Sequence, residues 1–202
     1  LMKKRPLQVG VTGGIGSGKS LICRIFACLG APAYDADSRA KIVMTTDGIL
    51  IEQIKKEFGS LSYDASGVLN RHYLSTTVFQ DEDKLKRLNA LVHPRVARDY
   101  KLWVDNQGDV KYVLKEAALL FESGSYQVLD KIIVVKAPRE VRIKRVLSRD
   151  PHRSRADIER IMDNQMDENE KEGRADFVIQ NDERNMVIPQ VLELHERFNS
   201  MN

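Results

Sequence analysis

The sequence predicts an α/β fold in which a parallel five-stranded sheet lies between layers of helices. Short apolar segments alternate with longer stretches whose apolar residues recur at helical spacing. The segment 132–135 is β-branched and uniformly apolar, which is typical of a parallel strand buried on both faces. A chain of 202 residues is long enough for one domain with a full hydrophobic core. The expected strands are Leu7–Thr12, Ala33–Tyr34, Val110–Leu114, Ile132–Val135 and Phe177–Gln180.

The composition favours a soluble, cytoplasmic protein. No apolar run approaches the roughly 20 residues that span a bilayer, and the N-terminal residues lack the apolar segment of a signal peptide. The net charge of +3 is too small to indicate a nucleic-acid partner, because basic and acidic residues are mixed along the chain. Cys23 and Cys28 fall on different faces of one expected helix, so we expect no disulfide between them and a reducing compartment.

A glycine-rich loop organises the chain. Residues 13–20 satisfy the pattern G-x-x-x-x-G-K-[ST] between the expected strand 7–12 and an expected helix whose apolar residues begin at Ile22. Glycines let the backbone turn its N–H groups toward a phosphate chain, and the positive dipole end of the helix points to the same place. The sequence therefore predicts a three-layer α/β/α P-loop NTPase fold that binds ATP or GTP.

Each part of this loop has an expected role. Lys19 is expected to reach the β- and γ-phosphates, the Ser20 hydroxyl to coordinate Mg²⁺, and the Leu21 N–H to face the α-phosphate. The residues expected to bind the nucleotide here are Gly14, Ile15, Gly16, Ser17, Gly18, Lys19, Ser20 and Leu21.

Two aspartates follow the second expected strand. Asp35 and Asp37 point the same way if the chain is still extended there, so both could meet a phosphate, its Mg²⁺ or an acceptor hydroxyl. Phosphoryl transfer needs a carboxylate that orients and deprotonates the acceptor. The alternative is that one of them caps the helix that begins near Ser38.

The chain between the second and third strands is expected to be helical from Ile49 to Gln107, with a polar interruption at 60–67. This is far more chain than a crossover requires, so we interpret it as a helical insertion that closes over an acceptor. Pro94 fits the first position of a helix, which places His93 at that helix's N-terminal boundary. Its ring could meet an anion or a ribose there, or His93 could be a boundary residue only.

An arginine-rich helix follows the fourth strand. It opens at Pro138, carries Arg145 and indicates a lid whose arginines neutralise charge in the transition state. Arg142 and Arg153 are expected on a solvated helix face. The helix expected over 156–171 has few apolar residues, which suits a mobile lid rather than a core element.

Several motifs together resemble one family. They occur in the family's order from about residue 7 to the end, and the chain is identified from them as similar to the dephospho-coenzyme A kinases. The motifs are the loop from Thr12 to Ser20, Asp35-Ala36-Asp37, Leu69-Asn70-Arg71, His93-Pro94, Leu119-Leu120-Phe121-Glu122, Arg145, Arg149-Asp150, Arg160-Ile161 with Gln165, and Ala175-Asp176 with Asn181.

The resemblance implies transfer of the ATP γ-phosphoryl group to the 3′-hydroxyl of the dephospho-CoA ribose, the last step of coenzyme A synthesis. It implies that Lys19 and Arg145 stabilise the transferring group and that Asp37 is the general base. ATP is then the co-substrate and Mg²⁺ the cofactor. Asp35 is a secondary candidate, acting through Mg²⁺, and Asn181 is expected near the adenine.

The acceptor is expected to meet Asp35, Arg71, His93 and Leu119. The expected organisation is a single kinase domain, a monomer or weak homo-oligomer, with ATP and dephospho-CoA as partners and no nucleic acid or membrane. Its parts are a core of residues 7–46, 108–150 and 174–202, an acceptor-binding insertion of residues 47–107, and a lid of residues 150–173.

The chain departs from the family at several places, which include Leu21, where the family frequently has Thr, and Arg39 and Lys41 after the two aspartates. Ala118 stands where the family commonly has proline, and Glu116 puts a carboxylate near the phosphate site. One alternative is another P-loop kinase for a small molecule or a nucleoside monophosphate, which leaves His93-Pro94 and Leu69-Asn70-Arg71 unexplained. The other is a slow nucleotide switch, against which no Asn-Lys-x-Asp guanine-reading motif occurs.

Overall fold

A computed structural model describes residues 5–79 and 81–201. The chain forms two compact units, which we describe one at a time. The first consists of the residues up to Asp35 together with those from Gln107 onward, and the second spans Ala36–Asn106.

The first unit is built on a five-stranded sheet of strand order β2-β3-β1-β4-β5, in which every neighbouring pair is parallel. This confirms the predicted α/β class. The strands are β1 (Leu7–Thr12), β2 (Ala33–Asp35), β3 (Tyr112–Glu116), β4 (Lys131–Lys136) and β5 (Phe177–Gln180).

Strand β3 lies two residues further along the chain than predicted. All five of its residues are buried, and Tyr112 packs against the rings of Phe26 and Phe198 and shares a 2.7 Å hydrogen bond with His195 Nδ1. This packing fixes the register, with Tyr112 opposite Leu7. The shift carries Lys115 and Glu116 into the strand.

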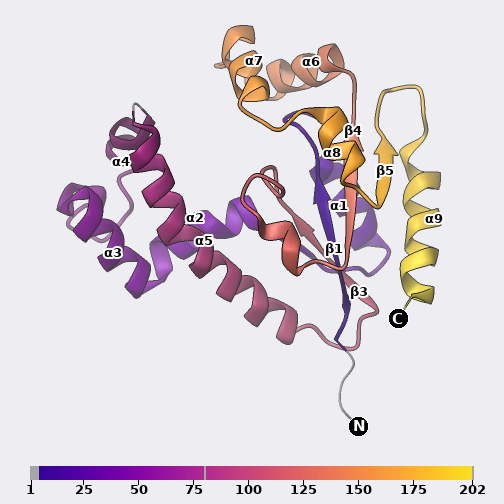
Figure 1. Cartoon of the computed structure of the whole chain (residues 1–202), viewed down its shortest axis with the longest axis horizontal. Coiled ribbons are helices and arrows are strands. Elements are labelled where there is room, and N and C mark those ends of the chain that lie inside the picture. Colours follow the sequence, from indigo (N-terminus) through magenta and orange to yellow (C-terminus); the bar gives the residue numbers. More distant parts are fainter. Residues whose placement is uncertain (1–4, 80, 202) are drawn as a thin grey trace. The chain divides into compact units, whose positions relative to one another are not determined.

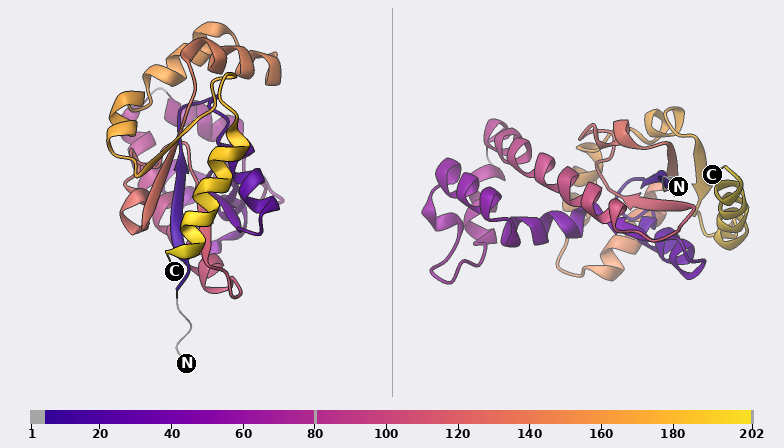
Figure 2. Two further views of the ribbon diagram at one scale, coloured as in Figure 1. Left: turned by 90° about the vertical axis from the view of Figure 1, so that its right-hand side faces the viewer. Right: turned by 90° about the horizontal axis from the view of Figure 1, so that it is seen from below.

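Helices α1 (Lys19–Cys28) and α9 (Val187–Ser200) cover one face of this sheet, as the left view of Figure 2 shows for α9. The core under them is apolar and includes Ile22, Phe26, Val191 and Phe198. Ile188, also in α9, is 55% exposed and lies outside this core. The turn η2 (Ser125–Val128) belongs to the segment over the opposite face.

Helices α6 (Arg139–Arg149), α7 (Arg155–Asp163) and α8 (Glu168–Gly173) follow β4 at the carboxyl end of the sheet (Figure 1). The single helix expected over 156–171 is therefore two helices. The break occurs because the Asp167 carboxylate caps α8, accepting hydrogen bonds from the Asn169 and Glu170 N–H groups.

Helix α7 is more than the polar lid element that the sequence suggested. Its Ile158 and Met162 are buried against Ile143 and Val146 of α6, and Ile15 of the glycine loop packs on the same cluster. The expectation that this region contributes nothing to a core is wrong, because two apolar positions four apart suffice to form one helix face.

The second unit is helical. It consists of α2 (Ala36–Thr46), α3 (Gly48–Phe58), the turn η1 (Ser60–Ser62), α4 (Arg71–Phe79) and α5 (Glu82–Asp105). Its own apolar core includes Val43, Leu50, Ile54, Leu74 and Leu88. The boundaries predicted for core, insertion and lid stay a prediction.

Pro94 does not begin a helix. It lies inside α5, so His93 is an interior helix residue and the predicted boundary is wrong. Proline removes one hydrogen bond from a helix and crowds the preceding turn. The helix continues because residues on both sides of Pro94 are buried, among them Val92 and Tyr100.

Across residues 5–79 and 81–201, no helix combines the length and the apolar character that crossing a membrane requires.

Candidate active site

The glycine loop joins β1 to α1 and leaves several backbone donors uncommitted. Gly16 and Gly18 have φ angles of 79° and 96°, which side chains rarely adopt. Within the described part of the chain, nothing accepts a hydrogen bond from the backbone N–H of Gly16, Gly18 or Ser20. Free amides at a helix N-terminus form a site for a phosphate group.

The Lys19 side chain lies over its own loop. Its ammonium donates to the carbonyl oxygens of Gly13, at 2.9 Å, and Gly14, at 3.3 Å. The positive charge is thereby held beside the amides, where it adds to the attraction for an anion. The Leu21 N–H donates to the Gly18 carbonyl at 3.0 Å.

Ser20 and Glu116 form the second part of the site. The Ser20 hydroxyl donates a 2.6 Å hydrogen bond to Glu116 Oε1. Glu116 ends β3 and stands in register with Val11 on one side and Asp35 on the other, so Glu116 and Asp35 share a face of the sheet. The sequence indicated that Glu116 is near the phosphate site, and the structure gives it a direct partner in the loop.

The oxygen donors of this second part suit Mg²⁺, which prefers few carboxylates and keeps several waters. Glu116 is buried and Ser20 is exposed. No group of three or more His, Cys, Asp or Glu residues able to hold a metal occurs within 5–79 and 81–201. The donor set therefore fits an ion that takes most of its ligands from phosphate and water, and does not fit a closed structural metal site.

Burial changes the pKa values of two groups near Glu116. It raises the pKa of the Cys23 thiol well above its usual value, and the negative charge of Glu116 and its hydrogen bond raise that pKa further. Cys23 and Cys28 are both free thiols. Burial lowers the pKa of Lys115, which precedes Glu116 in β3, to about 8.

Arg145 and Asn181, which the sequence assigns to the nucleotide site, contact each other. Arg145 donates to the Asn181 backbone oxygen at 3.0 Å and to Oδ1 at 3.4 Å, and lies 3.5 Å from Glu183 Oε1. The Asn181 amide nitrogen donates to the Ser17 carbonyl at 2.7 Å. The structure thus joins α6, the end of β5 and the glycine loop. The expected closeness of Asn181 to adenine stays a prediction.

Arg142 was expected on a solvated face, and this expectation is wrong. Only 6% of the residue is exposed, because its guanidinium lies against Gly14 and pairs with Glu168 Oε1 at 3.2 Å. The spacing contained a signal, since Arg142 lies four residues before the buried Val146. Glu168 was missed altogether, because nothing in its polar surroundings marks it in the sequence.

The remaining expected site residues lie elsewhere. Leu119 is exposed in the turn after β3. Asp37 lies in the first turn of α2, so it does not share an extended strand with Asp35. Arg71 is the first residue of α4 and His93 lies in α5; both are exposed, as is Asp37.

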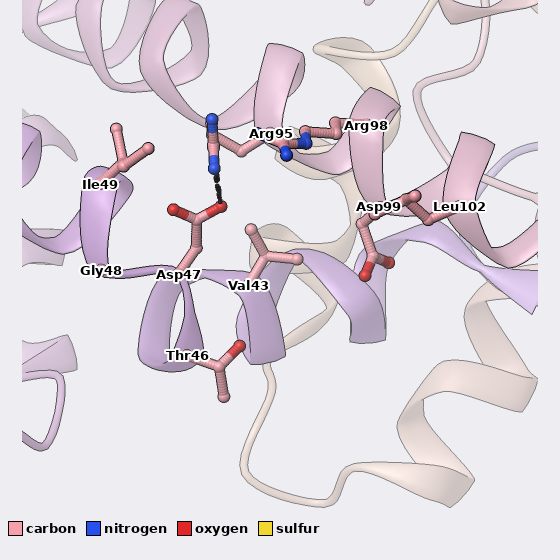
Figure 3. Close-up of a pocket in the computed structure, with 9 residues that line it drawn as sticks. All are labelled: Val43, Thr46, Asp47, Gly48, Ile49, Arg95, Arg98, Asp99 and Leu102. Atoms are coloured by element: carbon pink, nitrogen blue, oxygen red, sulfur yellow. Dashed lines mark hydrogen bonds and ion pairs between the residues drawn. The ribbon is translucent and has the colours of Figure 1, made fainter.

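The second unit has a pocket of about 620 Å³ of its own, lined by both charged and apolar side chains (Figure 3). Arg95 donates to Asp47 across it at 2.6 Å. Burial works against the charged form of Asp47, but the Leu50 N–H and the Arg95 guanidinium together lower its pKa. Neither Arg71 nor His93 lines this pocket. Its lining is Val43, Thr46, Asp47, Gly48, Ile49, Arg95, Arg98, Asp99 and Leu102.

The model of the dephospho-CoA kinase family matches residues 7–186. The chain belongs to this family. A dephospho-CoA kinase from Bacteroides fragilis is 35% identical to it over 93% of this chain and 91% of that protein. The prediction of the family from the sequence motifs is confirmed.

Solved structures agree with this membership. A crystal structure from Thermus thermophilus has a TM-score of 0.83 and 31% identity, covering 98% of each chain. A dephospho-CoA kinase from Campylobacter jejuni has a TM-score of 0.71 and 28% identity, covering 96% of this chain and 98% of that one. This dephospho-CoA kinase family member is accordingly an ATP-using P-loop kinase with the predicted fold.

Proposed function

We propose that this protein transfers the γ-phosphoryl group of ATP to the 3′-hydroxyl of the dephospho-CoA ribose, giving coenzyme A and ADP. The observation that carries the proposal is the glycine loop: free amides of Gly16, Gly18 and Ser20 with Lys19 held beside them. Family membership supplies the acceptor, which the loop alone does not identify.

On the nucleotide side, Lys19 and Arg145 stabilise charge on the transferring group. The Lys19 ammonium moves from the Gly13 carbonyl to the β- and γ-phosphate oxygens, a change that a flexible side chain makes easily. The contact of Arg145 with Asn181 supports its place beside the loop, because Asn181 is itself bound to Ser17.

On the acceptor side, Asp37 accepts the proton of the ribose 3′-hydroxyl as that oxygen attacks the γ-phosphorus. Its position in the first turn of the helix that follows β2 supports this role, since ligands of open α/β sheets bind at the carboxyl edge of the strands. Asp35, Arg71, His93 and Leu119 bind or orient the acceptor.

Mg²⁺ fits the oxygen donors of Ser20 and Glu116, which lie within hydrogen-bond distance of each other. When bound, it neutralises charge on the β- and γ-phosphate oxygens. Glu116 then serves to orient the Ser20 hydroxyl, and Asp35 lies on the neighbouring strand in the same register.

The same proposal includes a cytoplasmic location and a single kinase domain, acting as a monomer or weak homo-oligomer. The free cysteines are compatible with a reducing compartment.

A substrate panel tests the proposal. The purified protein is incubated with Mg-ATP and dephospho-CoA, a nucleoside monophosphate or shikimate, and ADP release is measured. ADP formed only with dephospho-CoA supports the proposal. Activity confined to a nucleoside monophosphate favours the alternative kinase, and ADP release that needs no acceptor favours the nucleotide switch.

A further inference from the structure

The first turn of the glycine loop is held by side chains from far along the chain. The Gly14 N–H donates to Glu168 Oε1 at 3.1 Å, and the Ile15 N–H donates to Gln165 Oε1 at 2.9 Å. These two amides precede the free amides of Gly16, Gly18 and Ser20. Glu168 and Gln165 therefore hold the backbone at the start of the loop, and they leave the amides of Gly16, Gly18 and Ser20 free for a phosphate group.

Arg142 completes the arrangement. Its Nη1 lies 3.2 Å from Glu168 Oε1, the oxygen that also receives the Gly14 N–H. A Cβ atom at Gly14 would lie 1.9 Å from that Nη1, and one at Gly16 would lie 2.5 Å from the Arg142 backbone oxygen. Helix α6 is thus pressed against two glycines of the loop, and the absence of their side chains makes this contact possible.

The burial of the Arg142–Glu168 ion pair indicates a role other than stabilising the fold. The Arg142 and Glu168 side chains are only 7% and 21% exposed, and Arg142 Nε and Glu168 Oε2 have no hydrogen-bond partner in the described part of the chain. A buried pair with unmet hydrogen bonds gives little net stability. The pair does, however, let a carboxylate hold a loop amide without adding net negative charge beside a triphosphate.

The segment that supplies these acceptors is itself held by contacts within the first unit. The Met166 N–H donates to Glu122 Oε1 at 2.9 Å, and the Lys171 ammonium lies 3.3 Å from the same oxygen, outside hydrogen-bond geometry. Lys136 of β4 pairs with Glu172. Residues 165–172 are therefore held by contacts with the turn after β3 and with the end of β4.

We propose that Arg142, Gln165 and Glu168 are positioning residues that hold the first turn of the glycine loop, so that its free amides converge on the nucleotide's phosphates. The inference rests on the proposed kinase function for its kinetic readout. Its structural readout and its ATP-binding readout do not depend on the acceptor.

The test compares Glu168→Ala and Gln165→Ala with Glu170→Gln. Glu170 is a matched control because it lies on the same helix and its side chain pairs only with the exposed Arg174 among the described residues. Hydrogen exchange at the Gly14 and Ile15 amides is measured together with the affinity for Mg-ATP, kcat and the melting temperature.

The proposal expects faster exchange at Gly14 in Glu168→Ala and at Ile15 in Gln165→Ala. It also expects a loss of about 10- to 100-fold in ATP affinity or kcat, because small displacements of a positioned site are costly. Glu168→Gln, which keeps an acceptor oxygen, is expected to restore part of the exchange protection, and Glu170→Gln to match the wild type.

Unchanged ATP affinity and kcat in both alanine variants, with a lowered melting temperature alone, would overturn the proposal and leave a merely structural role.

A further variant, Arg142→Met, tests the proposal even if the substitutions at Glu168 impair folding. It leaves the Glu168 charge unneutralised, so ATP affinity is expected to fall and to recover partly in the double variant Arg142→Met/Glu168→Gln; no recovery contradicts the role given to the pair. If the protein fails to phosphorylate dephospho-CoA while these binding and exchange results hold, the proposed function fails and this inference stands.

Discussion

The glycine loop and the helical unit, which we propose binds the acceptor, are built differently. Around the glycine loop, three side chains form hydrogen bonds with the loop backbone. They come from Gln165, which precedes α8, from Glu168 of α8 and from Asn181, which follows β5, and each is 150 or more residues away in sequence from its partner in the loop. In the helical unit, the expected general base Asp37 and the expected acceptor-binding residues Arg71 and His93 occupy three different helices and are exposed.

We attribute the difference to what each region is proposed to bind. A triphosphate is bound by several main-chain donors at once, so their positions must be set by packing before the ligand arrives. Exposed charged side chains on separate helices can instead adjust to an acceptor. The comparison predicts that substitutions near the loop affect nucleotide binding and stability together, whereas substitutions in the helical unit affect turnover more selectively.

The largest effect is expected for Lys19→Ala. Loss of the ammonium removes charge stabilisation of the transferring phosphoryl group, so kcat is expected to fall by about 10²- to 10³-fold. Steady-state kinetics with Mg-ATP and dephospho-CoA measures this. Lys144→Ala, at an exposed position of α6, is the control and is expected to be active. Undiminished turnover of Lys19→Ala would count against the phosphate-binding role of the loop.

Asp37→Asn tests the acceptor side. The amide cannot accept the proton of the ribose hydroxyl, so turnover is expected to fall by at least about 10²-fold, with ATP affinity largely kept. Calorimetric ATP titration and kinetics on the same sample separate the two quantities. Asp105→Asn, an exposed carboxylate at the end of α5, is the control. Full activity of Asp37→Asn removes that residue from the role of general base.

Asn181→Ala sharpens the comparison from the nucleotide side. It removes the hydrogen bond to the Ser17 carbonyl and one acceptor of Arg145. The free energy of unfolding is expected to fall by about 1–3 kcal/mol, because buried polar groups lose their partner. ATP affinity is expected to fall with it, as urea denaturation and ATP titration can show. A destabilised variant with unaltered ATP affinity would separate Asn181 from the nucleotide site.

The smallest effect is expected for Lys115→Met. The folded pKa of about 8 lies below the ordinary lysine value of 10.5, so the unfolded chain binds more protons between these values and wild-type stability rises with pH across that window. The variant lacks this dependence. It is expected to be more stable than the wild type at pH 7 by on the order of 1 kcal/mol, with the difference shrinking from pH 8 toward 10.5. Denaturation at several pH values measures this, and a difference that does not vary with pH contradicts it.

The sequence was sufficient where local patterns decide structure. The glycine loop, β1, β4 and β5 follow from short-range spacing, and each lies where it was predicted. The family followed from several motifs in order, which the family match confirms.

The errors occurred where distant parts of the chain decide. Arg142 is buried because Glu168, 26 residues further on, and Gly14 meet it in space. Pro94 stays within α5 because burial on both sides outweighs the lost hydrogen bond. The register of β3 depends on Tyr112 packing against Phe26 and Phe198. Apart from the helical spacing of Arg142 and Val146, none of these contacts has a local signature.

The interior proline gives α5 a mechanical property of its own. A helix of 24 residues is about 36 Å long, and Pro94 lies near its midpoint. Since proline has no N–H, the carbonyl of Ala90, four residues earlier, lacks the backbone hydrogen bond that would connect the two halves of the helix at this position. Bending α5 at Pro94 therefore costs less free energy than bending it elsewhere along the helix. His93 is the residue next to this point.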